Sequence, residues 1–593
     1  MIDVCFCEPF VISGILPTLG VSTLKNALNK KVTSKILYPS IQMFLESRLM
    51  ESPYFMELLD NIPLQVSEYL FFEGSPTDAA EIFPPSSQIN VEPYDLEYLK
   101  SIANDILWKT VNEIVELHPT VLVYSLTFGC YNFAKKLFSE VKLAIPDIKI
   151  VVGGSNCDVG FSAELIKSIT QIDYIICDET PSIFVELIED ILNKKAFISK
   201  YVTSKNHLAN SIKTIENMDE LVPPDFSDYM ELVRNYNISE DFITLPYEVS
   251  RGCWWCQKKP CTMCGFFGIK KNFVIKSPEK VIKELKQISQ KYGIKKFRFS
   301  DLVQPKTEYL QQIQNLSTLN LNLFWEIRPD IDEYDVFLLR NIGVTFSQIG
   351  LESLSTEQLK MMNKGTTGIY NIYVLLLCAS YKIDVEWNYL YGFQNDIEKW
   401  YTDVIKIIPF IYHLQPPVMR KVWINKYSEG FNENEVEIIQ NFSQLETNVA
   451  QTFFYQKNTP KAFLPVYKKL KIEIDKWTEN FNNDFGMYIE EQRDDYIRIT
   501  RIYEKSETFE FYDVQAKIYS FFSYPHTLNS AQQALNIDLH TIQKTVDRFF
   551  KNKLMLFFEG KYISLAVRNT PFKYTNTHDQ PLYLSKDIYK TCK

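Results

Sequence analysis

The chain has 593 residues, of which 46% are hydrophobic and 23% are charged, and its formal net charge is −10. This composition is typical of a soluble globular protein with several domains and excludes a disordered or fibrous chain. The negative balance also argues against non-specific binding to nucleic acid, so we expect no nucleic-acid partner.

The N-terminal segment MIDVCFCEPFVISGILPTLG is apolar, but Asp3 and Glu8 stand where a secretory signal would be positively charged. No uninterrupted apolar run reaches the roughly 18 residues of a membrane span. We therefore expect a cytoplasmic protein with no membrane partner. Eleven cysteines, four of them in one short segment, do not form a disulfide framework. In a reducing compartment they indicate a metal-binding or catalytic site.

The first 215 residues alternate between strand-like and helix-like segments, which predicts a doubly wound, Rossmann-like α/β domain with a parallel sheet. The strand-like segments are IDVCFCEPF, TVLVYSLTFG, IKIVVGGSN and DYIICDE. An insertion at about 40–100, rich in aromatic and acidic residues, interrupts this alternation. Residues 216–240 contain the Pro- and Asp-rich segment ENMDELVPPDFSDY and are predicted to form a linker.

Residues 241–430 alternate again, and six repeats of a strand and a helix predict a complete or partial (β/α) barrel. The strand candidates are ITLPYEVS, KKFRFSDL, LNLFWEIRPD, VTFSQIGLES, DVEWNYLYGF and KVWINKYS. The loops after the strands build the active site in such barrels. The segment RGCWWCQKKPCTMCGFFG follows the first strand candidate, so this position favours a functional role for its cysteines.

Residues 431–593 begin with a helical pattern and continue with the strand YIRITRIYE, two or three helices and the hairpin LMLFFEGKYISLAV. This order predicts a helical and winged-helix-like C-terminal domain. Two interpretations stay open. The domain binds a peptide by strand addition, or it forms a structural cap on the barrel.

The four clustered cysteines, Cys253, Cys256, Cys261 and Cys264, have the spacing C-x2-C-x4-C-x2-C. Structural zinc knuckles are usually about 15–20 residues apart, and a thioredoxin-like pair would open a helix in a compact βαβ domain. Closely spaced thiolates on a loop suit an iron–sulfur cluster. If three cysteines bind, the fourth iron is open to chelate S-adenosylmethionine (SAM), whose reductive cleavage yields a 5′-deoxyadenosyl radical.

The stretch SRGCWWCQKKPCTMCGFFG resembles the radical SAM enzymes, and among them the cobalamin-binding-type peptide maturases of the RiPP maturation radical SAM protein 1 family. The resemblance covers most of the chain. It extends to the segments LPYEVSRGCWW, IGLESLS, MNKGTT, WNYLYGF, HLQPP and GKYISLAV. It implies a cobalamin-binding-type domain, then a radical SAM (β/α)6 partial barrel, then the winged-helix-like region.

The resemblance assigns Cys253, Cys261 and Cys264 to a [4Fe-4S] cluster. The family has Gly where this chain has Cys256. Either Cys256 is a bystander thiol, or it replaces Cys253 in a C-x4-C-x2-C set. Binding by all four thiols would close the open iron and abolish SAM chemistry.

The resemblance and the barrel positions together also suggest the SAM contacts. Met263 is expected against the adenine, Asp301 near the amino group, and Arg328 in a bidentate pair with the carboxylate. The remaining candidates, at the ends of the fourth and fifth strands, are Glu352, Ser353 and Asn388. Each polar residue at a strand end could instead be an ordinary helix cap.

Cobalamin is expected at the strand ends of the first domain. The candidate contacts are Thr127, Phe128, Gly153, Gly154, Asn156 and Glu179. The D-x-H-x-x-G motif of histidine-ligated cobalamin proteins is absent, and His118 precedes its strand. The sequence therefore leaves two interpretations: cobalamin without a protein ligand, or a retained fold without the cofactor.

The function implied is cobalamin-dependent C-methylation of a ribosomally made precursor peptide at an unactivated carbon, with an electron donor such as flavodoxin or ferredoxin. The alternative is crosslinking, cyclisation or epimerisation of a peptide without methyl transfer. A remote alternative is a non-catalytic iron–sulfur protein that binds DNA through the winged helix. The sequence identifies no catalytic acid or base.

Overall fold

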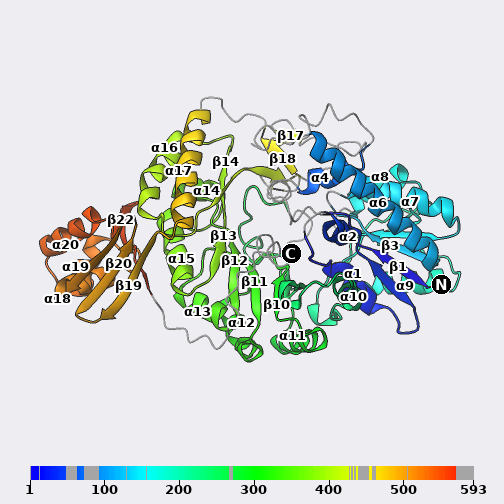
Figure 1. The fold of residues 1–593 in the computed structure, drawn as a ribbon, viewed down its shortest axis with the longest axis horizontal. Helices are drawn as coiled ribbons and strands as arrows, with labels where there is room; N and C mark the ends of the chain where they lie inside the picture. The colour runs from blue at the N-terminus through cyan, green and yellow to red at the C-terminus, as the bar shows by residue number, and fades with distance from the viewer. Residues whose placement is uncertain are drawn as a thin grey trace.

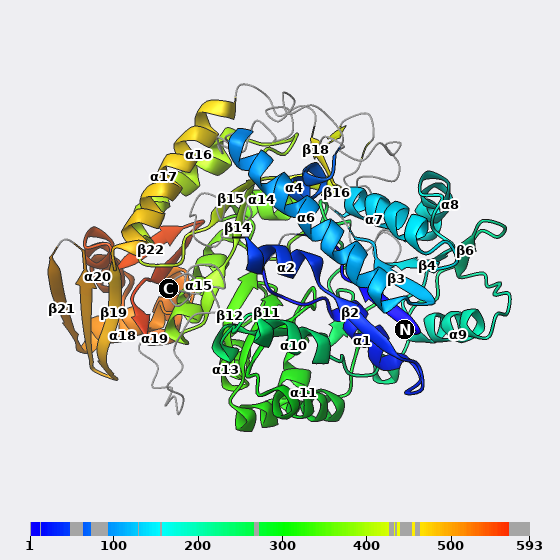
Figure 2. The same ribbon diagram turned by 45° about the vertical axis from the view of Figure 1, so that its right-hand side comes forward.

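The structure is a computed structural model. The residues that it describes are 2–11, 14–47, 63–72, 93–127, 130–154, 157–265, 272–425, 428, 432, 436–438, 453–456, 463–503 and 505–568. Figures 1 and 2 show three units in a row, with the barrel between an N-terminal and a C-terminal unit. No helix among these residues is both long enough and apolar enough to cross a bilayer.

The N-terminal unit is built on a six-stranded sheet with the order β2-β1-β3-β4-β5-β6, in which only β6 is antiparallel to its neighbour. Its strands are β1 (Val4–Cys7), β2 (Ser34–Leu37), β3 (Val121–Ser125), β4 (Lys149–Gly153), β5 (Tyr174–Ile176) and β6 (Val202–Ser204). Its helices are α1 (Leu19–Ala27), α2 (Pro39–Glu46), α4 (Pro63–Leu70), α6 (Pro93–Leu117), α7 (Tyr131–Ala144), α8 (Val159–Ser168) and α9 (Pro181–Leu192).

Helices cover both faces of this sheet, which explains why the central strands β1 and β3 are almost entirely buried. Val121 and Val123 face one core with α1 and α9, whereas Leu122 and Tyr124 face another with α6, α7 and α8. The chain moves outward from β1 to β2 on one side and to β3 on the other. The carboxyl ends of β1 and β3 therefore form the topological switch point, where ligands bind in such sheets.

The second unit is an open barrel of parallel strands. Its five-stranded sheet has the order β13-β12-β11-β10-β7, and a further parallel pair joins β14 to β15. The strands are β7 (Thr244–Tyr247), β10 (Lys296–Phe299), β11 (Asn322–Ile327), β12 (Val344–Ile349), β13 (Asp384–Glu386), β14 (Asn388–Tyr391) and β15 (Val418–Lys421). The predicted sixth strand, 421–428, overlaps β15 only at Lys421. The next strand, β16 (Trp423–Asn425), instead pairs antiparallel with β18 (Phe453–Gln456), which also pairs with β17 (Val436–Ile438).

The barrel helices alternate with these strands as expected, and the first of them, α10, precedes β7. They are α10 (Ser227–Asn235), α11 (Pro278–Tyr292), α12 (Thr307–Gln312), α13 (Glu333–Asn341), α14 (Thr356–Met361), α15 (Gly368–Ser380) and α16 (Glu398–Ile407). Short 3-10 helices are η3 (Met218–Glu220), η4 (Glu240–Phe242), η5 (Gln314–Leu319) and η6 (Ile408–Phe410). The segment SPEKVIKELKQISQKYG has amphipathic spacing, Ser-Pro at its start and Gly at its end, which predicts a helix. The structure confirms this prediction, because α11 follows Ser277 and ends before the left-handed Gly293.

The C-terminal unit contains the helices and the hairpin that the sequence predicts, but the single predicted strand is the middle one of three. After α17 (Leu464–Asn482) come three antiparallel strands, β19 (Gly486–Arg493), β20 (Tyr496–Ile502) and β21 (Ser506–Tyr512). Three helices and a hairpin follow, namely α18 (Asp513–Phe521), α19 (Leu528–Leu535), α20 (Leu539–Lys551), β22 (Met555–Phe558) and β23 (Lys561–Ser564). The short β24 (Val567–Arg568) pairs in parallel with β19.

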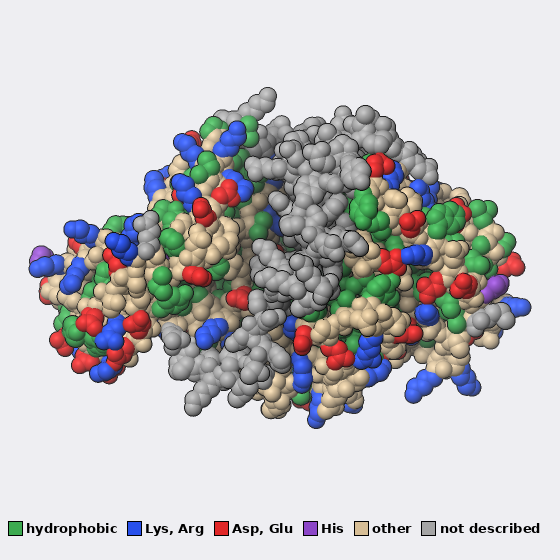
Figure 3. Space-filling view, viewed as in Figure 1, with side chains coloured by type: hydrophobic (Ala, Val, Ile, Leu, Met, Phe, Trp, Pro, Cys, Tyr) green, Lys and Arg blue, Asp and Glu red, His purple; other side chains and the backbone are tan. Residues whose placement is uncertain are grey.

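The hairpin and β24 dock this unit on the barrel. Glu559 at the hairpin turn accepts a hydrogen bond from the backbone N–H of Thr356, at the start of α14, at 2.8 Å. Arg568 forms an ion pair with Glu333 of α13 at 2.7 Å. On the face drawn in Figure 3, acidic and basic side chains are interspersed over the described part of the C-terminal unit.

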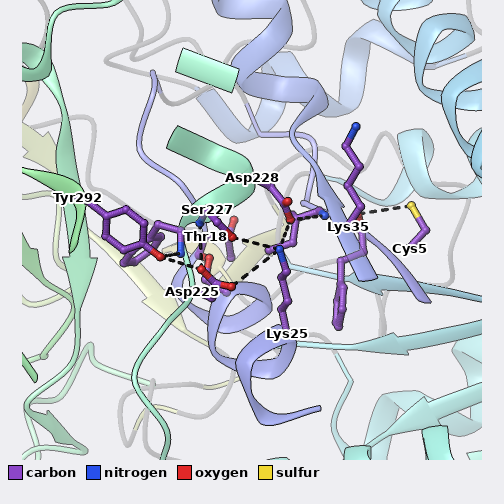
Figure 4. Close-up of polar contacts among 12 residues, drawn as sticks. Cys5, Thr18, Lys25, Lys35, Asp225, Ser227, Asp228 and Tyr292 are labelled. Carbon is purple, nitrogen blue, oxygen red and sulfur yellow. Dashed lines mark hydrogen bonds and ion pairs between the residues drawn. The ribbon is translucent and has the colours of Figure 1, made fainter. Parts of the chain in front are cut away.

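A polar cluster joins the N-terminal unit to the barrel (Figure 4). Asp228 of α10 accepts hydrogen bonds from Lys25 of α1 at 2.5 Å and from the backbone N–H of Ile36 in β2 at 2.8 Å. Asp225 accepts a hydrogen bond from the hydroxyl of Tyr292, the last residue of α11, at 2.7 Å. Burial alone would raise the pKa of Asp225, but the hydrogen bonds from Tyr292 and Ser227 hold that pKa at about 2.

We expect Asp228→Ala to lower the free energy of unfolding by about 3 kcal/mol, because it leaves the largely buried Lys25 ammonium without its main partner. The side chains of Lys25 and Asp228 are only 11% and 15% exposed. Urea denaturation measures the change. The control Asp403→Ala removes an exposed partner of Lys399 and should cost less than about 1 kcal/mol. Equal effects of the two variants would contradict this account of the junction.

Candidate functional site

The cysteine-rich segment forms a loop that begins at the carboxyl end of the first barrel strand. A short antiparallel pair, β8 (Ser250–Arg251) and β9 (Val274–Ile275), closes the base of this loop. Gly252 has φ +84°, and a Cβ atom there would lie 2.2 Å from the carbonyl oxygen of Asn272. Only glycine therefore allows the chain to turn from β8 into the loop at this point.

The thiols of this loop differ from the other described cysteines. Cys253, Cys256, Cys261 and Cys264 are half-buried, whereas all the remaining described cysteines are buried. Burial raises the pKa of Cys253, and this is partly opposed by hydrogen bonds from the backbone N–H groups of Cys256 and Trp255 and by the charge of Arg328. Within the described part of the chain, no three Cys, His, Asp or Glu side chains have the geometry for a metal ion. Accessible thiols on one loop fit the donor set of an iron–sulfur cluster.

Two indole rings fasten the loop to the barrel. The Nε1 of Trp254 donates to the carbonyl of Gln304 at 2.9 Å, and that of Trp255 donates to the carbonyl of Asn363 at 3.0 Å. The guanidinium of Arg328 lies over the ring of Trp255, 4.1 Å from its centroid. Arg328 is thereby held beside Cys253, and its Nη2 donates to the carbonyl of Lys364 at 2.6 Å.

Both carboxylate oxygens of Asp301 accept hydrogen bonds from the segment that leads into the loop. Its Oδ2 accepts from the backbone N–H of Val249 at 3.0 Å, and its Oδ1 accepts from the hydroxyl of Ser250 at 2.5 Å. The residue is only 1% exposed, and burial raises its pKa to about 7. In this structure Asp301 therefore anchors the base of the cysteine loop.

The other predicted SAM residues fall into two groups. Met263 packs on an apolar cluster with Leu390 and Phe393, and the carboxylate of Glu352 pairs with Lys364 at 3.2 Å. By contrast, Ser353 is completely buried and donates to Gln358 at 2.6 Å, which makes it part of an internal network.

Asn388, at the start of β14, accepts a hydrogen bond from Arg420 of β15 at 2.9 Å. Thus the carboxyl-end side of the barrel carries the cysteine loop, Met263, Arg328 and the Glu352–Lys364 pair. Ser353 and Asp301 are buried beneath them and hold the strand ends and the base of the loop in place.

Sequence reasoning missed Asp396, which holds the turn after β14. Its Oδ2 accepts from the backbone N–H groups of Gly392 and Phe393, each at 3.0 Å, and from the hydroxyl of Tyr467 at 2.5 Å. Phe393 belongs to the apolar cluster that Met263 contacts. The helix α17 is therefore connected to the predicted adenine side of the barrel. A Gly followed four residues later by Asp signals a turn, but nothing in the sequence links it to Tyr467.

The carboxyl ends of β3 and β4 lie against each other in the N-terminal unit. The carbonyl of Gly153 accepts from the backbone N–H of Leu126, and a Cβ atom on Gly154 would lie 2.6 Å from the carbonyl oxygen of Leu126. Gly154 has φ +116°, so this close approach requires glycine. Thr127 donates its backbone N–H to the sulfur of Cys130 at 3.2 Å. Phe128 and Asn156 lie outside the described residues.

Glu8 directly follows β1, at the switch point of the sheet, and was not singled out as a site residue from the sequence. It is 4% exposed, and its Oε2 has no hydrogen-bond partner among the described residues. Burial raises its pKa to about 8, despite hydrogen bonds with Thr18. His118 lies at the amino end of β3, is exposed and has φ 44°. The described residues after β1 thus place a buried carboxyl group with a raised pKa at the switch point.

Glu179 connects the two parts of the candidate site. Its carbonyl oxygen accepts a hydrogen bond from Nη1 of Arg251 at 2.9 Å, and its carboxylate accepts from the backbone N–H of Ile215 at 3.3 Å. Arg251 is two residues before Cys253. A predicted cobalamin contact and the cysteine loop therefore touch directly.

Comparisons with known proteins give distant relatives and no matching family model. The chain is 21% identical to the anaerobic magnesium-protoporphyrin IX monomethyl ester cyclase of Rubrivivax gelatinosus, over 53% of this chain and 58% of the cyclase. It is 26% identical to the bacteriochlorophyllide d C-12(1)-methyltransferase of Chlorobaculum tepidum, over 38% of this chain and 47% of that enzyme. The chain spans about half the length of these two relatives.

Two solved structures share the fold. The cobalamin-dependent radical SAM enzyme OxsB, with aqua-cobalamin and SAM bound, aligns with a TM-score of 0.55 and 13% identity, over 81% of this chain and 67% of OxsB. The radical SAM methyltransferase TsrM from Kitasatospora setae, with tryptophan and a SAM analogue bound, aligns with a TM-score of 0.51 and 11% identity, over 81% of this chain and 90% of TsrM. These similarities confirm the predicted fold class, and the resemblance to peptide maturases stays a prediction.

Glu8 predicts a measurable pH dependence. Its pKa is higher in the folded than in the unfolded protein, so the folded state binds the extra proton between about pH 4.5 and 8 and loses stability as the pH rises through that window. Replacing Glu8 by Gln removes this loss. The unfolding free energy of Glu8→Gln relative to wild type should therefore rise by up to about 1.4 kcal/mol per pH unit.

Urea denaturation of both proteins at pH 5, 6, 7 and 8 measures this difference. The control Glu357→Gln changes an exposed carboxylate that pairs with Lys360 on the surface of α14. Its difference from wild type should stay nearly constant with pH. A constant difference for Glu8→Gln as well would mean that Glu8 is ionised in the folded protein.

Proposed function

We propose that the chain is a radical SAM enzyme that holds a [4Fe-4S] cluster with Cys253, Cys261 and Cys264. The observation that carries this proposal is the set of accessible thiols on the loop at the carboxyl end of β7, in direct contact with the carboxyl-end loop of an N-terminal doubly wound sheet. The fold shared with OxsB and TsrM supports it. Such a cluster supplies the electron that cleaves SAM to methionine and a 5′-deoxyadenosyl radical.

The residues around the loop would bind and orient SAM. Met263 and its apolar neighbours would cover the adenine, and the guanidinium of Arg328 would pair with the carboxylate group. We propose Glu352 as the acidic partner for the amino group, because both carboxylate oxygens of Asp301 already accept hydrogen bonds from Val249 and Ser250. Asn388 remains a proposed contact at the start of β14. Ser353 would act from the internal network, by fixing the end of the fourth strand.

Cobalamin would lie over the carboxyl ends of the N-terminal strands, with Thr127, Gly153, Gly154 and Glu179 at its edge. We favour methyl transfer over crosslinking or epimerisation because one distant relative is named as a methyltransferase and so is TsrM. Phe128 and Asn156 stay proposed from the sequence alone. The reaction suits a reducing cytoplasm with a flavodoxin or ferredoxin as electron donor.

A ribosomally made precursor peptide is the substrate that we propose. Among the described strands, β21 ends its sheet, so its outer backbone groups pair with no other strand and could take a peptide by strand addition. Arg548 of α20 lies 5.6 Å from the ring of Phe511 in β21 and places positive charge beside this edge. The interspersed charges in Figure 3 lend no support to the alternative of DNA binding.

Anaerobic protein with a reconstituted cluster, dithionite and SAM should release 5′-deoxyadenosine. Coexpression with the small peptide encoded nearby, with and without cobalamin, should give a cobalamin-dependent mass gain of one methyl group. A loss of two hydrogens would favour crosslinking, and an unchanged mass with altered chirality would favour epimerisation. No deoxyadenosine from iron-loaded protein would refute the radical SAM function.

Cys256 should be dispensable. In Cys256→Gly, which restores the residue of the resembled family, iron content and deoxyadenosine release should stay within about twofold of wild type, because three thiolates already hold the cluster. The matched variants Cys253→Ala, Cys261→Ala and Cys264→Ala should each lose most of the iron. Loss of iron in Cys256→Gly, with iron retained in Cys253→Ala, would establish the C-x4-C-x2-C set instead.

A further inference from the structure

We propose that Arg251 is a positioning residue that sets the placement of the cysteine loop relative to the cobalamin side of the N-terminal unit. This inference rests on the proposed function and deepens it. A side-chain hydrogen bond of Arg251 joins the base of the cysteine loop to the loop after β5. It therefore lies where a change in one residue would alter the geometry between two cofactors without removing a ligand of either.

The planar guanidinium fork of Arg251 donates hydrogen bonds to two different partners. Its Nε and Nη2 donate to the two carboxylate oxygens of Glu248, at 2.7 and 3.0 Å, in a bidentate pair. Its Nη1 donates to the carbonyl of Glu179, at 2.9 Å. Glu248 thus fixes the orientation of the fork, and the remaining edge of the fork reaches the N-terminal unit. A lysine ammonium has no such fixed fork and could not hold both partners in this geometry.

Residues 213–221, which lead into the linker, reinforce the same contact at Glu179. The backbone N–H of Glu179 donates to the carbonyl of Lys213 at 3.2 Å, and its carboxylate accepts from the backbone of Ile215. Ile215 then packs in a buried cluster with Met218 and Leu221, against Val274. Val274 is the strand partner of Arg251 in the β8–β9 pair. The loop after β5, the linker and the base of the cysteine loop form one continuous contact.

The barrel fixes the opposite side of this segment. Asp301 holds Val249 and Ser250, and Gly252 turns closely under Asn272. The segment 249–252 is therefore held firmly against the barrel. The hydrogen bond from Arg251 then fixes the position of Glu179 relative to this segment. Cys253 begins immediately after it. The position of the first cluster ligand relative to the end of β5 thus depends on this side chain together with the contacts of residues 213–221.

This dependence matters because the proposed reaction joins groups held by different units. Radical formation requires only the barrel, whereas methyl transfer also requires the N-terminal sheet at the correct distance and angle. A misplacement of about 1 Å can cost on the order of 100-fold in rate. Loosening Arg251 should therefore lower the yield of methylated peptide per deoxyadenosine released.

The test compares Arg251→Gln and Arg251→Lys with the control Arg234→Gln. Arg234 pairs with Glu240 on the surface, and its side chain is 57% exposed. In protein without cofactors, hydrogen–deuterium exchange should become about tenfold faster at 177–180 and 249–252 in both Arg251 variants. In loaded enzyme with peptide, methylated product per deoxyadenosine should fall about tenfold or more, at unchanged iron content. The control should match wild type in every readout.

The outcomes separate this inference from the proposed function. An Arg251→Gln protein with wild-type exchange and a wild-type ratio of methylated peptide to deoxyadenosine would overturn the positioning role alone. Suppose instead that exchange becomes faster and that iron content, deoxyadenosine release and methylation all fall by the same factor. That result would also overturn the positioning role, because Arg251 would then be needed only for folding of the loop. A wild-type protein that releases no deoxyadenosine would refute the proposed function and the positioning role with it.

Discussion

The hydrogen bonds that hold the segment between the first barrel strand and Cys253 are the constraint on which the rest of the site depends. Asp301 fixes this segment to the barrel through Val249 and Ser250, and Arg251 fixes it to the N-terminal unit through Glu179. The guanidinium of Arg251 is charged, and hydrogen bonds from a charged donor are stronger than neutral ones. The cysteine loop therefore starts from a defined position, while its thiols stay accessible.

Buried carboxyl groups recur at the strand ends that surround the site. Glu8 follows β1, Asp301 follows β10, and Asp396 lies in the turn after β14. Burial raises the pKa of each. Burying a carboxyl group costs free energy, which hydrogen bonds from backbone N–H groups offset for Asp301 and Asp396. Carboxyl ends of parallel strands meet at one edge, so such side chains can set the loops of that edge in place before any ligand binds.

The sequence predicts the features that depend on local pattern. The alternation of apolar segments gives the doubly wound unit, the barrel strands and the helices and hairpin of the C-terminal unit, and the Ser-Pro start and Gly end of α11 give its bounds. Contacts between distant segments cannot be obtained this way. Asp301 suggests a ligand contact from its position at a strand end, yet it binds Val249 and Ser250, 52 and 51 residues away. A single sequence likewise cannot predict the hydrogen bonds from Arg251 to Glu179 and from Tyr467 to Asp396.

The central claim is that a cluster on the cysteine loop faces a cobalamin on the N-terminal sheet. Electron paramagnetic resonance of anaerobic protein that contains both the reduced cluster and cob(II)alamin tests it directly. The account predicts a magnetic interaction between the two centres, seen as splitting or faster relaxation of the cob(II)alamin signal relative to protein without the cluster. Two independent, unperturbed signals from fully loaded protein would contradict it.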